Sequence, residues 1–140
     1  MTSPVWFTYV ARPNKIFMPQ LQARLSVDGR EQSGPCSFLI DTAAGVSIAP
    51  ESYLLSLVDF SGIAEQPTGC VDINNKPVVG KPVLLTVSIG RLPPIEETIF
   101  FTSGDTPWGL LGQKVFLQRT RAYFFNSFSS EDRKFGLMAR

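Results

Sequence analysis

One carboxylate, Asp41, stands directly after the short apolar run Phe38-Leu39-Ile40. Such a run is typical of a buried strand, and a carboxylate beside an apolar interior is costly unless another group partners it. The group that partners Asp41 is therefore a candidate for the function of the chain. If that group is a second carboxyl, the pair can share a proton and act as acid and base together, because two adjacent carboxyls do not both ionise cheaply.

The composition argues against several other kinds of chemistry. The chain has no histidine, which removes Ser-His-Asp and Cys-His catalysis and most zinc sites. Its two cysteines, Cys36 and Cys70, could form one disulfide, but we expect free thiols, and they are too few and too far apart for a metal knuckle. We expect no metal and no cofactor. The net charge is +1 without a basic cluster, so neither nucleic acid nor an anionic membrane is expected as a partner.

Length and composition predict one globular domain built mainly from strands. The 140 residues are 44% apolar and 18% charged, and 11 glycines and 11 prolines punctuate short strand-like segments, which favours a closed or sandwich-like β domain. We place the domain at residues 16–140, after an arm of residues 1–15 whose role the sequence does not define. Strands are expected near residues 18–27, 36–41, 69–73, 76–80, 83–89, 98–102, 122–128 and 134–138, and short helices at 50–58 and 114–119.

Targeting signals are not recognisable in the sequence. The amino-terminal residues do not resemble a signal peptide, and no apolar run approaches the ~20 residues that span a membrane. We therefore expect a cytoplasmic protein, or a segment of a longer one.

Four segments together resemble the aspartic peptidases. Asp41-Thr42-Ala43-Ala44 is similar to the active-site motif of that family, Asp-Thr/Ser-Gly-Ala/Ser after two or three aliphatic residues. Leu110-Leu111-Gly112 resembles the aliphatic-aliphatic-glycine segment that crosses beneath this motif. A hairpin at residues 69–80 stands where the family has its flap, and the closing Phe135-Gly136-Leu137 is similar to the end of these domains. In this order the segments span residues 21–138.

A chain of this length with one such motif resembles the retropepsins, the single-lobe, homodimeric aspartic peptidases of small cellular type. The resemblance implies an all-β, retropepsin-like acid-protease barrel with one or two short helices. It also implies an aspartic endopeptidase in which Asp41 from each of two subunits activates a water, with an extended peptide or protein as substrate. Two-fold symmetric dimers are the commonest oligomers, so a homodimer of this kind is an ordinary arrangement.

The resemblance assigns roles to the residues around Asp41. Thr42 would hydrogen-bond across the dimer to the opposing motif, and Ala43 would offer its carbonyl to the main chain of the substrate. The active-site loop would be supported by Ala44, Leu110, Leu111 and Gly112. The tip of the flap would be formed by Ile73, Asn74 and Asn75, and the pocket walls by Trp108, Val46 and Ile48.

Two features depart from the family pattern. Ala43 replaces a glycine, which costs little if its φ is negative and much if its φ is positive. Gly45 and Gln113 stand where many retropepsins have an acidic residue and an arginine. Both halves of that ion pair are missing together, so no unpaired charge is left, and we expect altered packing of the dimer.

Other interpretations of the same residues stay open. The chain could be a catalytically silent retropepsin-fold module for dimerisation or peptide binding, silenced by Ala43. It could also be an unrelated β-barrel binding module in which Asp41 only forms a turn at the end of a strand. A second catalytic motif at Asp105-Thr106 is disfavoured, since Pro107 lacks the backbone donor of that position and no apolar strand precedes it.

Overall fold

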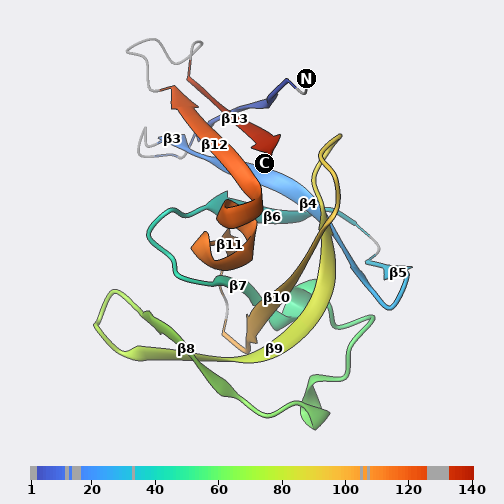
Figure 1. Ribbon diagram of the computed structural model, residues 1–140. Coiled ribbons are helices and arrows are strands. Elements are labelled where there is room, and N and C mark those ends of the chain that lie inside the picture. Colours follow the sequence, from blue (N-terminus) through green and yellow to red (C-terminus); the bar gives the residue numbers. More distant parts are fainter. Residues whose placement is uncertain are drawn as a thin grey trace.

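Strands make up most of the chain in a computed structural model, which describes residues 3–11, 13, 17–32, 34–104, 106, 108–125 and 133–140 (Figure 1). The main sheet has eight strands in the order β5-β4-β6-β11-β7-β10-β9-β8, and a further pairing of β4 with β9 closes most of it into a barrel. The expected all-β barrel is therefore confirmed. Its strands are β4 (Gln20–Val27), β5 (Arg30–Glu31), β6 (Cys36–Ile40), β7 (Ser47–Pro50), β8 (Gln66–Val71), β9 (Pro77–Ser88), β10 (Ile95–Thr102) and β11 (Gly109–Leu111).

The core of the barrel is built from alternating side chains. Along β4 the residues Leu21, Ala23, Leu25 and Val27 are buried, as the alternation in the sequence predicts. The same period of two places Ile95, Glu97, Ile99 and Phe101 of β10 inside. All but one of these eight side chains are apolar, so the barrel has a hydrophobic interior with one acidic residue in it.

The short strand β11 sets the geometry around Asp41. It lies between β6 and β7, parallel to β6 with Leu111 opposite Ile40, and antiparallel to β7 with Leu110 opposite Ile48. Strands β6 and β7 follow each other in the chain but do not pair, because β11 separates them. The loop of residues 41–46 therefore has to cross the end of β11.

The strand β9 is longer than the sequence predicts. The two strands expected at residues 76–80 and 83–89 are one strand, β9, which pairs with β8 through residues 77–80 and with β4 through residues 86–88. Pro82 lies between these two pairings, so its missing N–H removes no bond on that side of the strand. The prediction of two strands was therefore wrong, because Pro82 does not interrupt β9.

Neither expected helix is regular. At residues 50–58 the chain forms only a 3₁₀ turn, η1 (Glu51–Tyr53), because Pro50 is still extended at φ −71° and ψ 145° and Leu54 leaves the helical region at φ −126°. A second 3₁₀ turn is η2 (Phe60–Gly62). At residues 114–119 the chain forms a distorted turn, η3 (Gln113–Leu117), with Val115 at φ 148°. No helix in the described part of the chain is long and apolar enough to cross a membrane.

The two ends of the described chain meet in a separate sheet. Strand β1 (Val5–Thr8) pairs with β13 (Lys134–Ala139), which pairs with β12 (Thr120–Phe125); a small ladder joins β2 (Val10–Ala11) to β3 (Phe17–Met18). Figure 1 shows β12 and β13 at the top of the view, with the N and C labels close to them. Part of the expected arm thus forms an edge strand of this sheet. Strand β12 begins at Thr120, and residues 126–128 of the expected strand lie outside the described residues.

Candidate active site

The carboxylate of Asp41 is fixed by the backbone of its own loop. Its Oδ1 accepts the N–H of Ala43 at 2.9 Å and the N–H of Ala44 at 3.2 Å, while the N–H of Asp41 donates to the carbonyl of Leu111 at 3.0 Å. Asp41 is half-buried, and its Oδ2 has no hydrogen-bond partner within the described residues. One oxygen is therefore held in place and the other is available to a ligand.

The segment after β11 forms the floor of this loop. The N–H of Gln113 donates to the carbonyl of Ala44 at 2.8 Å, and the N–H of Lys114 donates to the carbonyl of Gly45 at 3.0 Å. The side-chain amide of Gln113 donates to the carbonyl of Thr42. Sequence reasoning noted Gln113 only for the arginine it replaces, yet this neutral side chain ties the loop to its floor.

Gly112 has no room for a side chain. A Cβ on Gly112 would lie 2.7 Å from the carbonyl oxygen of Ala44 and would overlap the carbonyl oxygen of Val46. Its N–H donates to the hydroxyl of Ser47 at 3.1 Å. Loop and floor therefore pack backbone against backbone at this point, which only glycine allows.

The alanine that replaces the motif glycine carries no backbone strain. Among the described residues other than glycine, only Asp28, Asn75 and Val115 have a positive φ, so the φ of Ala43 lies outside the left-handed region. Ala43 is also exposed. The fold therefore tolerates the methyl group of Ala43. If the methyl group has an effect, it acts on the binding of a substrate or partner subunit at this loop.

A groove of about 670 Å³ lies between the Asp41 loop and the β8–β9 hairpin. In Figure 1 the β6–β7 loop and this hairpin lie on the same side of the barrel, at the left of the view. Asp41, Ala43, Ala44, Leu110 and Ile73 line the groove. The other lining residues come from the loop, from the hairpin, from β7 and from the end of β10 and the segment after it: Gly45; Gly69, Cys70, Val71, Asp72 and Val78; Ile48; and Thr102 and Thr106. The lining is mainly apolar, and the carboxylates of Asp41 and Asp72 are its charged groups.

The other expected site residues lie around the groove. Thr42 and Trp108 are not among its lining residues, and Leu111 and Gly112 are buried beneath the loop. Asn74 and Asn75 form the hairpin turn, where Asn75 has φ 59° and the carboxylate of Asp72 accepts the N–H of Asn74 at 2.8 Å. The expected hairpin turn is confirmed, but it is the residues before it that line the groove together with Asp41. Thr102 and Thr106 were missed, since Thr102 was expected only as the last residue of the strand at 98–102 and Thr106 lies in the segment after it, where the sequence carries no binding signal.

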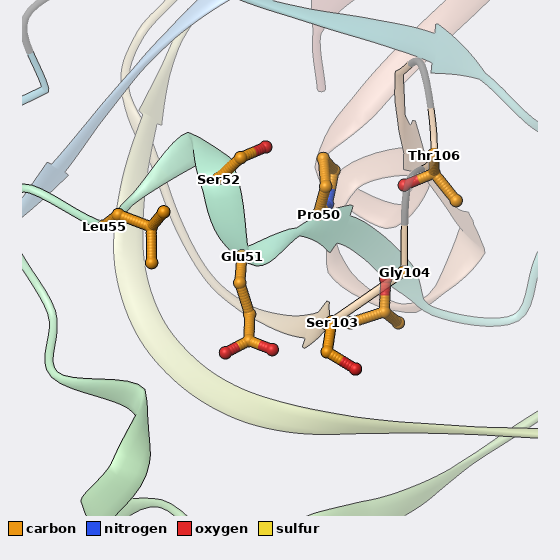
Figure 2. Close-up of a pocket in the computed structure, with 8 residues that line it drawn as sticks. Pro50, Glu51, Ser52, Leu55, Ser103, Gly104 and Thr106 are labelled. Atoms are coloured by element: carbon orange, nitrogen blue, oxygen red, sulfur yellow. The ribbon is translucent and has the colours of Figure 1, made fainter.

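A second hollow, of about 640 Å³, adjoins the groove and shares Thr102 and Thr106 with it. Figure 2 shows the Glu51 carboxylate and the Ser103 hydroxyl pointing in the same direction there. Glu51 already has a cation nearby, since the ammonium of Lys81 lies 4.0 Å from its carboxylate. The hollow therefore meets the groove at Thr102 and Thr106 and adds the polar groups of Glu51 and Ser103 there.

A buried acid, Glu97, lies within the barrel near this floor. Glu97 is 3% exposed, and one of its carboxyl oxygens has no partner in the described part of the chain. The hydroxyl of Ser47 is the neighbouring polar group that acts on the pKa of this carboxyl. Burial raises the pKa of Glu97 from its ordinary value of 4.5 to about 7, against a lowering by the Ser47 hydrogen bond. The sequence signal was available: Glu97 occupies an inward position between Ile95 and Ile99.

This raised pKa predicts a pH-dependent stability. The unfolded chain loses the Glu97 proton above pH 4.5 and the folded chain only above about 7, so the unfolded state binds fewer protons in that window. The free energy of unfolding of the wild type should therefore fall by about 3 kcal/mol relative to Glu97→Gln between pH 4.5 and 7. Urea unfolding at a fixed chain concentration measures this; parallel pH curves for the two proteins would contradict it.

One solved structure resembles this chain over nearly its whole length. A retropepsin-like aspartic protease from Rickettsia conorii matches with a TM-score of 0.64 and 18% identity, covering 98% of this chain and 93% of that chain. The foamy viral protease-reverse transcriptase in complex with an RNA/DNA hybrid matches with a TM-score of 0.41 and 19% identity, over 68% of this chain and 11% of that one. No protein-family model matches the sequence, and neither does any curated protein. The chain therefore has the retropepsin-like fold.

Proposed function

We propose that the chain is an aspartic endopeptidase that acts as a homodimer. The observation that carries the proposal is the fixed carboxylate of Asp41, which lines an apolar groove beside the β8–β9 hairpin and has one oxygen without a partner among the described residues. The retropepsin-like aspartic protease of similar fold supports the same reaction class. The reaction is the hydrolysis of a peptide bond by an activated water.

The chemistry requires a second carboxyl group. One carboxylate takes a proton from the water while a carboxylic acid protonates the carbonyl oxygen of the peptide. Asp72 also lines the groove, but its Oδ1 is used by the N–H groups of Asn74 and Lys76 in its own turn. Asp41 of the partner subunit is therefore the proposed second acid, and the exposed Thr42 lies beside it to bond across the dimer axis.

An extended peptide suits the groove. Strand β8 is the last strand of the main sheet, so its outer edge has backbone groups to pair with a peptide strand. Ile48, Leu110 and Val78 give the groove apolar walls for alternate side chains of such a peptide. We expect substrates with large apolar residues on either side of the cleaved bond.

The test is cleavage of a diverse peptide mixture by the purified chain between pH 4 and 8, with products identified by mass spectrometry. We expect cuts that are absent with Asp41→Asn, and a rate per chain that rises with concentration until the dimer is saturated. A verified dimer that cuts nothing would contradict the proposal. So would cleavage that survives the loss of Asp41.

A silent peptide-binding module is the second candidate, because the Ala43 methyl group lies in the lining of the groove. The two candidates separate with Ala43→Gly. If the chain is an active peptidase, this variant should keep or raise kcat/KM, since the backbone already has a conformation that either residue adopts. Peptide binding without cleavage by the natural chain, with cleavage gained in Ala43→Gly, would establish the silent module.

A further inference from the structure

Glu97 and Ser47 connect the interior of the barrel to the floor of the Asp41 loop. Glu97 lies on β10, and Ser47, which is 1% exposed, lies on the neighbouring strand β7. The hydroxyl of Ser47 accepts the N–H of Gly112 at 3.1 Å. Ser47 stands opposite Ile99 in the register of the two strands, one inward position from Glu97, and hydrogen bonding by its hydroxyl lowers the pKa of the Glu97 carboxyl. Ser47 is therefore the neighbour both of the buried acid and of the Gly112 amide.

Packing alone does not account for an acid at this position. Burying a carboxyl group that leaves one oxygen unpartnered is costly, whereas an apolar side chain would fill the same space between Ile95 and Ile99 without that cost. What the carboxyl adds is an acceptor for the hydroxyl of Ser47. Because a hydroxyl has a single hydrogen, its bond to Glu97 turns the lone pairs of Ser47 toward Gly112.

A shift of Gly112 would reach both sides of the Asp41 carboxylate. On one side, Leu111 accepts the N–H of Asp41 at 3.0 Å. On the other, Gln113 donates to the carbonyl of Ala44, whose own N–H holds the Oδ1 of Asp41. Gly112 itself is wedged beneath the carbonyls of Ala44 and Val46. Small displacements of the floor are thus transmitted directly to the carboxylate.

We propose that Glu97 is a positioning residue for the active site: through Ser47 it fixes the amide of Gly112 and so holds the floor on which Asp41 is oriented. The inference rests on the proposed peptidase function of Asp41. Glu97 and Ser47 thereby support catalysis from the barrel interior, without contacting the substrate.

No charged group stands opposite Glu97 in the described elements that pack on β10. Strand β7 has no titratable residue, and the one charged side chain of β9, Lys81, lies opposite Phe101 and donates to the carbonyl of Phe60 at 2.9 Å. In η3 the charged residue is Lys114, which is exposed, and Glu96 on β10 itself is also exposed. Glu97 therefore acts through hydrogen bonding in its neutral form, which is the main form at pH values below its raised pKa.

The kinetic test compares Ser47→Ala, Glu97→Leu and Glu97→Gln with the wild-type dimer at pH 5, using one cleaved peptide. Ser47→Ala and Glu97→Leu should lower kcat about tenfold with KM nearly unchanged, while Glu97→Gln, which keeps an acceptor for Ser47, should retain kcat. The melting temperature of Glu97→Leu should stay equal or rise, so lost activity is not lost folding. Glu96→Leu, on the exposed face of the same strand, is the matched control and should change neither value.

A second readout does not depend on peptide cleavage. In ¹⁵N-labelled protein the amide signal of Gly112 should move with a midpoint near pH 7 in the wild type and not in Glu97→Gln. Its hydrogen exchange, compared at one pH, should be at least about tenfold faster in Ser47→Ala and Glu97→Leu. If no peptide is cut, the peptidase proposal fails and this readout still decides the hydrogen-bonded path. An unaltered Gly112 amide in Ser47→Ala and Glu97→Leu, or full kcat in Glu97→Leu, overturns the inference.

Discussion

Replacing Asp41 with asparagine should abolish peptide cleavage, with kcat/KM falling by roughly 10³-fold or more. The amide oxygen of asparagine still accepts the N–H groups of Ala43 and Ala44 that the carboxylate accepts at 2.9 and 3.2 Å, so the loop keeps its shape. An amide cannot take up the proton of the attacking water, so the chemical step fails although the groove is intact. Product formation measured over hours at high enzyme concentration gives the residual rate.

The control for this variant changes the same functional group outside the groove. Asp59 caps η2 by accepting the N–H of Ser61 at 3.1 Å and does not line the groove. Asp59→Asn should therefore leave kcat/KM within about twofold, since surface substitutions away from such a site have small effects. Equal dimer mass and equal peptide affinity for Asp41→Asn and the wild type would assign the loss to chemistry. A rate for Asp41→Asn close to that of the wild type would exclude Asp41 as the catalytic acid.

Gly112→Ala should destabilise the fold by about 2–3 kcal/mol and remove most of the activity. The added Cβ would come within 2.7 Å of the Ala44 carbonyl oxygen and overlap that of Val46, and both belong to backbone that cannot rotate away as a flexible side chain does. Either the floor or the loop has to move, and both carry hydrogen bonds that orient Asp41. Urea unfolding and the rate of peptide cleavage measure the two effects.

Gly62→Ala is the matched control for this substitution. A Cβ on Gly62 has nothing within 4 Å, and the residue lies in η2, away from the Asp41 loop. Its free energy of unfolding should change by less than about 0.5 kcal/mol. If Gly112→Ala were no less stable than Gly62→Ala, the loop and the floor would have room to separate, and the close packing between them would not matter for stability.

Ala43 shows how a departure from a motif can be judged only in its local backbone. From the sequence, an alanine in place of glycine was either nearly neutral or strongly strained, depending on the sign of φ. The φ of Ala43 is not positive, so the substitution costs the fold little. Because Ala43 lines the groove, the effect of the substitution on activity depends on the ligand that binds there.

The features that depend on neighbours in the chain were predictable. Alternation along β4, the strand that leads into Asp41 and the turn at Asn74-Asn75 arise from side-chain period and backbone preference over a few residues. The extent of β9 and the irregular turns η1 and η3 were not predictable in this way. Pro82 is tolerated because it lies between the pairings of β9 with β8 and with β4. Leu54 and Val115 leave the helical region at φ −126° and 148°.

The sequence by itself determined a β domain, an acid placed at the end of a buried strand, and a hairpin later in the chain. Only the tertiary structure decided that β11 lies between β6 and β7, which brings Gly112 and Gln113 beneath the Asp41 loop. It also decided that Glu97 and Ser47 lie on neighbouring strands and that the segment before the hairpin turn lines the same groove as Asp41. The physical reason is that strand order is set by the burial and hydrogen bonding of the whole chain, whereas alternation and turns are set by adjacent residues.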